Sequence, residues 1–189
     1  GAEQLAVQQA LDRGGSFSST PTTGARIVAG ASALDRRADA PRAGDGDLTL
    51  VAYAHSFLGD GSGASLPWMQ EIPDPVTKAS WVSWAEISNA TSKRLGVSFG
   101  DVVQIATALG SVELPAYPRG GVRDDIVAVA IGQGHTHGQY ASMTNDGAPG
   151  VARGVNILAL LPAEPDASGA RTFTGTPAKL AKTGAFSRI

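Results

Sequence analysis

The sequence contains no cysteine among its 189 residues. Iron–sulfur clusters, c-type haem attachment, thiolate zinc sites and disulfides all require cysteine, so the chain cannot carry any of them by itself. A strong charge of one sign is also lacking, because 15 Lys and Arg residues stand against 17 Asp and Glu residues, for a formal net charge of −2. The chain therefore has no basic field to attract nucleic acid or anionic lipid.

Long hydrophobic runs are missing as well. No apolar stretch approaches the ~20 residues that a membrane-spanning helix needs, and no charged n-region with an apolar h-region opens the sequence. We therefore expect no direct membrane insertion and no nucleic-acid partner. Charged residues make up 17% of the chain, whereas glycine (24) and proline (11) are frequent, which favours many turns over long helices.

The N-terminal quarter of the chain differs from the rest. Residues 3–12 (EQLAVQQALD) predict a short helix, which ends at a pair of glycines. Residues 14–47 are largely Gly, Ser, Thr and polar turn residues, apart from IVAGASAL (27–34), which could form a strand or a half-buried turn. We interpret 1–47 as an N-terminal helix and flexible linker, and 48–189 as one folded domain.

Short strands separated by turns dominate the remaining sequence. Apolar segments predict strands at 48–56, 79–87, 102–107, 112–117, 126–131, 155–161 and within 171–180. One helix is expected at 89–96 (NATSKRLG), where Asn89 can cap the first turn and Gly96 can take the left-handed closing conformation. Seven or so short strands, few short helices and glycine-rich connections argue for a mainly β fold that closes into a barrel.

The segment GQGHTHGQY (132–140) follows the apolar run IVAVAI and admits several interpretations. A dinucleotide-binding turn needs a helix after its glycines, but the glycines read G-x-G-x-x-x-G and the following QYASMTNDGAPG cannot extend far as a helix. A metal site would use His135 and His137, yet zinc needs three or four ligands, so His55 and a carboxylate would have to join them. A loop that contacts a nucleotide or pterin and a tight connection with positive φ both stay open.

Four segments together resemble a known family. They are LPWMQEIPDPVTKASWVSWAEIS (66–88), ATSKRLGVSFGDVVQIATALGSVELPAY (90–117), VAVAIGQGHTHGQYAS (127–142) and GVNILALL (154–161). In order and motif they resemble the C-terminal, molybdopterin-dinucleotide-binding domain of the molybdopterin oxidoreductase superfamily. The resemblance implies a double-psi β-barrel. The motifs LPWMQE–PDP and IGQGHT resemble in particular the iron–sulfur/molybdopterin-like large subunits of respiratory complexes such as alternative complex III.

The resemblance also implies a cofactor-binding end of the barrel. In cofactor-bearing relatives, loops of this domain hold the pterin and guanine-nucleotide portions of molybdopterin guanine dinucleotide by hydrogen bonds. Carried over motif by motif, the cofactor-binding residues would be His55, Ser56, Pro67, Trp68, Gln70, Glu71, Gly132, Gln133, Gly134, His135, Thr136, His137 and Asn156. No catalytic residue and no metal ligand is expected here, because in this family these belong to other domains.

Two functions follow as expectations from the resemblance. In the first, the chain is the cofactor-binding-type domain of a molybdopterin oxidoreductase-like, iron–sulfur electron-transfer subunit; it is not catalytic alone, and the isolated chain binds no cofactor. In the second, it is a structural docking domain of a respiratory complex subunit that has lost the molybdenum cofactor. The implied partners are other domains or subunits of a membrane-associated oxidoreductase complex, on the periplasmic side of the cytoplasmic membrane. An independent small enzyme is a weaker third interpretation, because no catalytic constellation is recognisable.

Overall fold

The computed structural model describes residues 2–12, 46–142, 150–165 and 168–189. The chain divides into two units, Gly1–Ala38 and Asp39–Ile189. In the first unit, helix α1 (Ala2–Asp12) agrees with the helix predicted from the sequence. The strand or turn predicted at 27–34 and most of the predicted linker lie outside the described residues, and the domain boundary stays a prediction. Throughout the described part of the chain, helices are too short or too polar to cross a bilayer.

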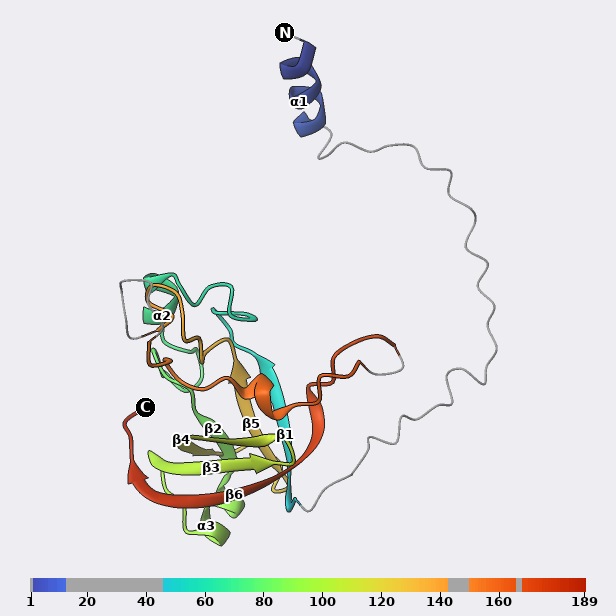
Figure 1. Cartoon of the computed structure of the whole chain (residues 1–189). Helices are drawn as coiled ribbons and strands as arrows, with labels where there is room; N and C mark the ends of the chain where they lie inside the picture. The colour runs from blue at the N-terminus through green and yellow to red at the C-terminus, as the bar shows by residue number, and fades with distance from the viewer. Residues whose placement is uncertain (1, 13–45, 143–149, 166–167) are drawn as a thin grey trace, which may run out of the picture. The chain divides into compact units, whose positions relative to one another are not determined.

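Six strands form a closed barrel in the second unit (Figure 1). They are β1 (Leu48–Ala54), β2 (Ala85–Ser88), β3 (Asp101–Thr107), β4 (Gly110–Arg119), β5 (Ile126–Ile131) and β6 (Thr174–Phe186). Their order around the barrel is β1-β5-β2-β4-β3-β6, and β6 closes it by pairing with β1. The helices in the described part of this unit are short: α2 (Pro67–Glu71), α3 (Asn89–Leu95) and the 3-10 helix η2 (Ile157–Leu160). The mainly β barrel predicted from the sequence is confirmed, while the finer double-psi topology stays a prediction.

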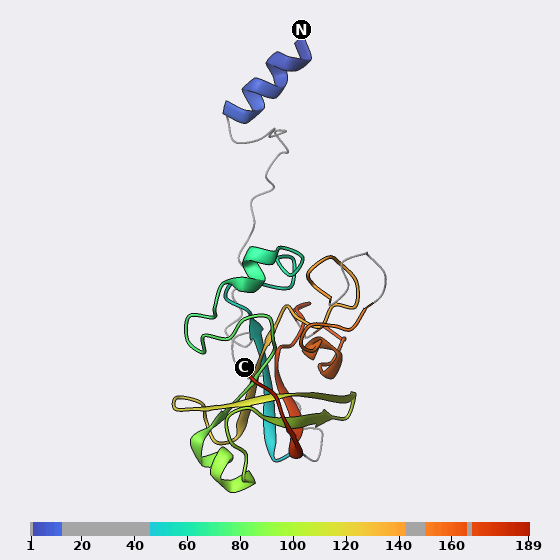
Figure 2. The ribbon, with the colours of Figure 1, turned by 90° about the vertical axis from the view of Figure 1, so that its left-hand side faces the viewer.

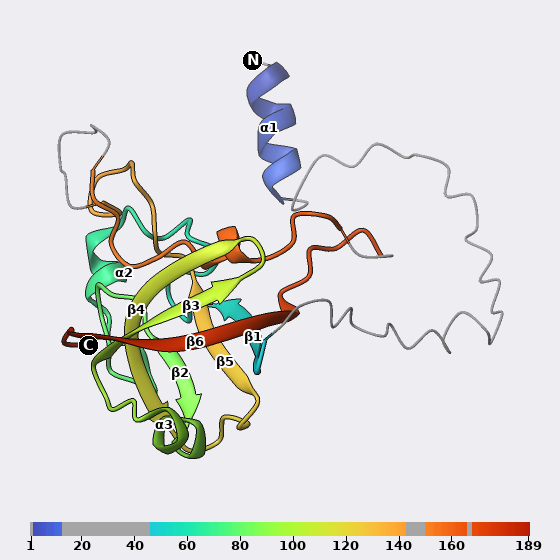
Figure 3. The same ribbon diagram turned by 60° about the horizontal axis from the view of Figure 1, so that its bottom comes forward.

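Alternate residues of the strands fill the barrel interior. Leu50 and Ala52 of β1, Val103 and Ile105 of β3, and Val127 and Val129 of β5 are all buried in one cluster. Successive side chains of a strand point to opposite faces, so a period of two places one apolar set inside. Figure 3 shows β3, β4 and β6 side by side along one wall of this barrel.

The strand directions decide which loops share an end of the barrel. β1 and β5 run parallel, with Ala54 opposite Ile131 at their last residues. β2 runs antiparallel to β5, so the chain enters β2 at the end where β1 and β5 leave. The loops that follow β1 and β5 and the segment that precedes β2 therefore meet there. Figures 1 and 2 show α2 at this end of the barrel and α3 at the other.

Helix α3 is capped one residue before the predicted position. Ser88, at the end of β2, accepts the backbone N–H of Thr91 at 3.0 Å through its Oγ. Ser88 is extended, with φ −68° and ψ 156°, whereas Asn89 is already the first helical residue. The predicted Asn89 cap is therefore wrong, because strand and helix join without a loop between them. Gly96 closes the helix in the left-handed conformation, with φ 62°, as predicted.

Two predicted strands differ from the structure. Residues 155–161 contain the 3-10 helix η2 (Ile157–Leu160) instead of a strand. The buried residues of η2 lie three apart, and the Asn156 side chain caps its first turn. A short apolar run fits a buried strand and a helical turn equally well, so periodicity could not separate them. The strand predicted at 79–87 shortens to Ala85–Ser88, because Trp81 has a φ of 65° that interrupts extended backbone.

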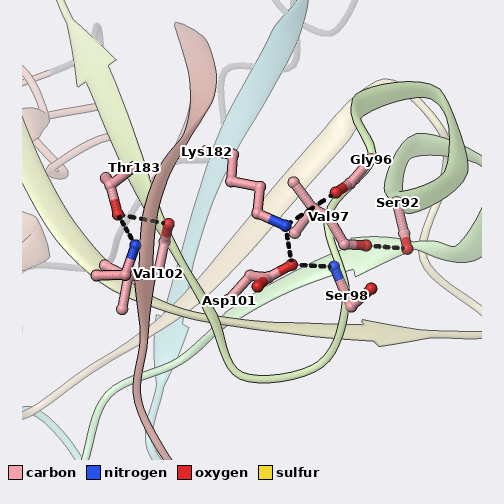
Figure 4. A network of polar contacts seen from close by, with 9 residues as sticks. Ser92, Gly96, Val97, Ser98, Asp101, Val102, Lys182 and Thr183 are labelled. Carbon is pink, nitrogen blue, oxygen red and sulfur yellow. Dashed lines mark hydrogen bonds and ion pairs between the residues drawn. The ribbon is translucent and has the colours of Figure 1, made fainter.

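A polar network fixes β6 against β3 and the end of α3 (Figure 4). Lys182 Nζ lies 2.7 Å from Asp101 Oδ2 and donates to the Gly96 carbonyl at 3.2 Å. The same Asp101 oxygen accepts the Ser98 backbone N–H at 2.7 Å. Thr183 Oγ1 donates to the backbone of β3 at 2.9 Å. The hydrogen bond from Lys182 and that from Ser98 lower the pKa of the Asp101 carboxyl below its usual value.

Candidate functional site

The segments that the resemblance named as cofactor contacts meet at one end of the barrel. His55 follows the last residue of β1, and Gly132 follows the last residue of β5. Pro67–Glu71 are helix α2, and Asn156 immediately precedes η2. Hydrogen bonds and close backbone packing join these segments, so residues scattered over about a hundred positions become neighbours. Their role in binding stays a prediction.

His55 is a buried residue that shapes its own turn. Its Nδ1 accepts the backbone N–H groups of Phe57 and Leu58, each at 3.2 Å. Its ring lies edge-on to that of Trp84, with centroids 5.7 Å apart. Burial lowers the pKa of the imidazole below 6.5, against the opposing charge of Asp74. His55 is therefore neutral at pH 7, and its Nδ1 is already engaged within the loop.

Asp74 ties the proline-bounded turn after α2 to the loop after β1. Its Oδ1 accepts the backbone N–H groups of Val76 and Thr77 at 3.0 and 2.8 Å, and the Thr77 hydroxyl at 3.0 Å. Ser56 Oγ donates to its Oδ2 at 3.4 Å. Burial alone would raise the pKa of the Asp74 carboxyl, but these hydrogen bonds outweigh burial and lower it. Asp74 is thus a charged acceptor that holds the turn.

Gln70 and Gln133 join α2 to the loop after β5. Gln133 Nε2 donates to Gln70 Oε1 at 2.7 Å, and Gln70 Nε2 donates back to Gln133 Oε1 at 3.3 Å. Gln70 Nε2 also donates to the Ala64 carbonyl at 2.9 Å. The two side chains are 1% and 6% exposed. Both amides are therefore occupied with protein groups, and they hold the loop in place.

The glycines of this loop allow three segments to pack closely. Gly132 and Gly134 have φ values of 109° and 89°. A Cβ on Gly132 would lie 3.2 Å from the Cβ of Leu58, and one on Gly134 would overlap the backbone nitrogen of Asn156. The N–H of Gly134 donates to the Arg153 carbonyl at 2.8 Å. Contact between loops therefore accounts for both glycines, as the tight-connection interpretation expected.

The remaining predicted contact residues offer polar groups or an aromatic ring to solvent. Trp68 is 58% exposed, Pro67 is half-buried, and Glu71, His135, Thr136, His137 and Asn156 are exposed. Thr136 Oγ1 and His137 Nδ1 lie 3.0 Å apart. Asn156 Oδ1 accepts the Leu158 N–H at 3.2 Å and caps η2. These imidazole, hydroxyl, carboxylate and amide groups can form hydrogen bonds with a ligand at this end of the barrel.

A metal at His135 and His137 would require further ligands nearby. Within the described ranges, no three His, Asp or Glu side chains are grouped as metal ligands would be. His55, the third histidine, uses Nδ1 for its own turn. The described residues therefore give no support to the metal interpretation.

Arg153 belongs to the same end of the barrel and was not singled out from the sequence. Its guanidinium Cζ lies 4.6 Å from the centroid of the Trp81 ring, and its Nε donates to the Tyr140 carbonyl at 2.8 Å. Two residues further on, the N–H of Val155 donates to Ser83 Oγ at 3.1 Å. The available signal was an arginine directly before GVNILALL, one of the segments that carry the resemblance.

A second polar cluster, also unforeseen, centres on the buried carboxylate of Glu86 in β2. Its Oε1 accepts the Tyr53 hydroxyl at 2.7 Å and Trp84 Nε1 at 3.1 Å. Its Oε2 lies 3.1 Å from Arg119 Nε. Burial, together with the bond to Glu86, raises the pKa of Tyr53. This cluster joins β1, β2 and β4, and two hydrogen bonds and one ion pair compensate the buried charge of Glu86.

Comparison with known proteins gives a family and a fold. A family model described as "Molydopterin dinucleotide binding domain" matches residues 70–168. The arsenate respiratory reductase molybdopterin-containing subunit ArrA of Chrysiogenes arsenatis is 37% identical over 81 residues, which cover 43% of this chain and 10% of that protein. The solved structure of acetylene hydratase from Pelobacter acetylenicus matches 72% of this chain and 18% of its own, with a TM-score of 0.51 and 19% identity.

The chain thus spans only about a tenth to a fifth of the length of these relatives. The likeness to acetylene hydratase shows the shared barrel fold and nothing further. The family match is more specific, because it includes the end of α2 from Gln70, the strands β2 to β5, the loop after β5 and η2. It covers more than half of the chain, and the chain therefore belongs to the molydopterin dinucleotide binding domain family.

Proposed function

We propose that this chain is the cofactor-binding domain of a molybdopterin oxidoreductase-type, iron–sulfur electron-transfer subunit, and that it is not catalytic alone. In the parent protein, the end of the barrel formed by α2, the loop after β5 and Asn156 would hold part of a molybdopterin guanine dinucleotide. One observation carries the proposal: three distant segments of the family match are locked together at one end, through Gln70, Gln133 and the contact of Gly134 with Asn156.

The groups at this end suit a pterin or guanine edge. His135, Thr136 and Asn156 present nitrogen and oxygen atoms that donate or accept hydrogen bonds, and all three are exposed. Trp68 of α2, 58% exposed, adds a flat apolar surface at the same end of the barrel. A bound molybdopterin cofactor would supply the redox chemistry, whereas these residues would bind and orient its organic portion.

The parent would provide what this chain lacks. Without cysteine, the chain holds no ligand for an iron–sulfur cluster. The relative from Chrysiogenes arsenatis is by name a molybdopterin-containing subunit, and this chain corresponds to a tenth of its length. The partners would be other domains or subunits of a membrane-associated oxidoreductase complex, on the periplasmic side of the cytoplasmic membrane.

One observation favours a second candidate, a docking domain that has lost the cofactor. The amides of Gln70 and Gln133 bind each other, and the glycines of the loop pack against protein. Near them, Trp68, Ile72 and Val76 expose 58%, 38% and 60% of their surface. Exposed apolar side chains of this kind suit contact with another protein surface as well as with a ligand.

Two-dimensional NMR of the labelled chain during titration with GMP and GDP tests the proposal. Binding should be weak, because other domains would supply the second wall of the site, and it should shift the amide signals of 132–137, 67–71 and 156. The turn 120–125, at the opposite end of β5, is the internal control and should not shift. Shifts confined to that turn, or none at any ligand concentration, would favour the docking function. The purified chain should also show no turnover with any electron donor and acceptor.

A further inference from the structure

Arg153 is held at the junction of three loops. Its guanidinium stacks on Trp81, which belongs to the segment before β2, with Cζ 4.6 Å from the ring centroid. Its Nε donates to the carbonyl of Tyr140 in the segment after β5, at 2.8 Å. Its own carbonyl accepts the N–H of Gly134 at 2.8 Å. The side chain and the backbone of Arg153 are therefore both fixed by the residues that form the candidate site.

The backbone at both supports of Arg153 is strained. Trp81 and Tyr140 have φ values of 65° and 66°, in the left-handed region that non-glycine residues rarely adopt. Among the described residues, Lys78 is the one further non-glycine residue with positive φ, and it lies three positions before Trp81. Such conformations cost on the order of 1–3 kcal/mol each and concentrate at ligand-binding sites. Two of these strained residues, Trp81 and Tyr140, are therefore the ones that orient the guanidinium.

Within the described residues, no carboxylate pairs with the charge of Arg153. Arg119 and Arg123 pair with Glu86 and Asp125, whereas no ion-pair partner for Arg153 is found in the described part of the chain. A guanidinium has five N–H donors in a planar fork, and the Tyr140 carbonyl takes the one on Nε. The Trp81 ring covers a face of the fork, and its two terminal nitrogens form no hydrogen bond within the described ranges, so that outer edge suits a ligand.

We propose that Arg153 binds a phosphate group of the nucleotide ligand through the two terminal nitrogens of its stacked guanidinium. This inference rests on the proposed function and adds which chemical group of the ligand one residue of that site binds. The planar fork matches the oxygen spacing of a phosphate, and two parallel charge-assisted hydrogen bonds form in one orientation. The aromatic ring and the Tyr140 carbonyl fix the fork beforehand, so little side-chain entropy is lost when the phosphate binds.

Titrations of the 189-residue chain with GDP, guanosine and inorganic pyrophosphate test this assignment. GDP should bind more tightly than guanosine, and the advantage should shrink as the salt concentration rises. Arg153→Gln should weaken GDP about tenfold and leave guanosine unchanged. Arg153→Lys should recover only part of the loss, because an ammonium cannot form the bidentate contact. Arg123→Gln, which removes the same charge at the opposite end of β5, should bind GDP like the wild type.

A measurement on the wild type guards against misfolding of the variants. GDP should shift the Nε–H signal of Arg153, and guanosine should not. If GDP and guanosine bind alike and Arg153→Gln changes neither, the assignment of Arg153 is wrong while the proposed function stands. If pyrophosphate binds and guanosine does not, the result supports phosphate binding by Arg153 and contradicts a dinucleotide site. If GDP, guanosine and pyrophosphate all fail to bind the wild-type chain, both the assignment of Arg153 and the proposed function are overturned.

Discussion

Gln70 and Gln133 lie 63 positions apart and exchange two hydrogen bonds between their buried side-chain amides. Loss of one amide leaves the other buried without its partner, which costs about 1–3 kcal/mol. We predict that Gln70→Leu and Gln133→Leu each lower the free energy of unfolding by about 2 kcal/mol, and that the double variant loses clearly less than the sum. Urea unfolding of the wild type, the two single variants and the double variant measures this coupling.

Gln104 provides a matched control for this cycle. It also donates to a side chain of a neighbouring strand, Glu113, but at 3.5 Å and in solvent. Gln104→Leu should therefore change the free energy of unfolding little. Strictly additive losses at Gln70 and Gln133 would mean that the two amides do not depend on each other, and that α2 and the loop are joined in another way.

His55 should make stability depend on pH near neutrality. Burial lowers the pKa of its imidazole from 6.5 in the folded state, so the unfolded chain binds the proton more readily. The contribution of His55 to the free energy of unfolding is therefore complete above pH 6.5. It is lost as the pH falls from 6.5 toward the pKa of the folded state. In His55→Asn, an amide oxygen can accept the Phe57 N–H in place of Nδ1 but does not titrate. The variant should lose less stability than the wild type between about pH 8 and pH 5.

Chemical unfolding at a series of pH values measures this difference, and an NMR titration of His55 gives its pKa directly. Asp74 is the charged group that opposes the effect of burial. Asp74→Asn should therefore lower the pKa of His55 further. Equal slopes of stability against pH in the wild type and in His55→Asn would rule out His55 as the titrating group.

Tyr53 should stay protonated at pH values where tyrosine normally ionises. Burial and the hydrogen bond to Glu86 raise its pKa above the ordinary 10.0. Because the pKa is higher in the folded state, the contribution of Tyr53 to the free energy of unfolding is complete below pH 10.0. It is lost as the pH rises above 10.0. In the folded protein just above this pH, the phenolate absorbance should be the same in Tyr53→Phe as in the wild type. A smaller phenolate signal in the variant would contradict the raised pKa.

The cost of the same substitution reports on the hydrogen bond. Tyr53→Phe should lower the free energy of unfolding by about 1 kcal/mol at neutral pH. Glu86→Leu should cost more, because it leaves the Arg119 guanidinium without its ion-pair partner and the Trp84 indole N–H without its acceptor. Equal effects of the two variants would mean that Glu86 contributes only through Tyr53.

Several elements could be predicted from the sequence because their signals are local. β5 (Ile126–Ile131) is an apolar run bounded by turn residues, and its predicted limits agree with the structure. Gly96 closes α3 because glycine takes the left-handed conformation at little cost. Helix α2 was not predicted: its buried residue is the polar Gln70, so its five residues have no apolar periodicity.

The candidate site could be predicted only in part, since its assembly depends on strand pairing. The motifs identified the segments, but the parallel pairing of β1 with β5 is what brings their loops to one end. The partner of Gln70 could not be inferred, because it depends on the packing of α2 against the loop after β5. Arg153 was missed for a related reason. The features that fix it, a stacked ring and two strained backbone positions, appear only after folding.

Gly134 and Gly121 have nearly the same positive φ, 89° and 86°, in very different surroundings. A Cβ on Gly121 would meet nothing within 4 Å, whereas one on Gly134 would overlap the backbone nitrogen of Asn156. Alanine at either position strains the left-handed backbone by about 1–2 kcal/mol, and at Gly134 the forced separation of two loops adds about 1–3 kcal/mol. We predict that Gly134→Ala lowers the free energy of unfolding at least twice as much as Gly121→Ala, as measured by urea unfolding.

The difference between the two variants isolates the contact between the loop after β5 and the segment before η2, because the conformational strain is common to both. Gly134→Ala should also shift the NMR signals of Val155 and Asn156, which Gly121→Ala should leave in place. Equal losses of stability would mean that the two loops separate easily enough to admit a methyl group. In that case close packing could not explain the glycine at 134, and approach of a ligand to the loop backbone would become the better explanation.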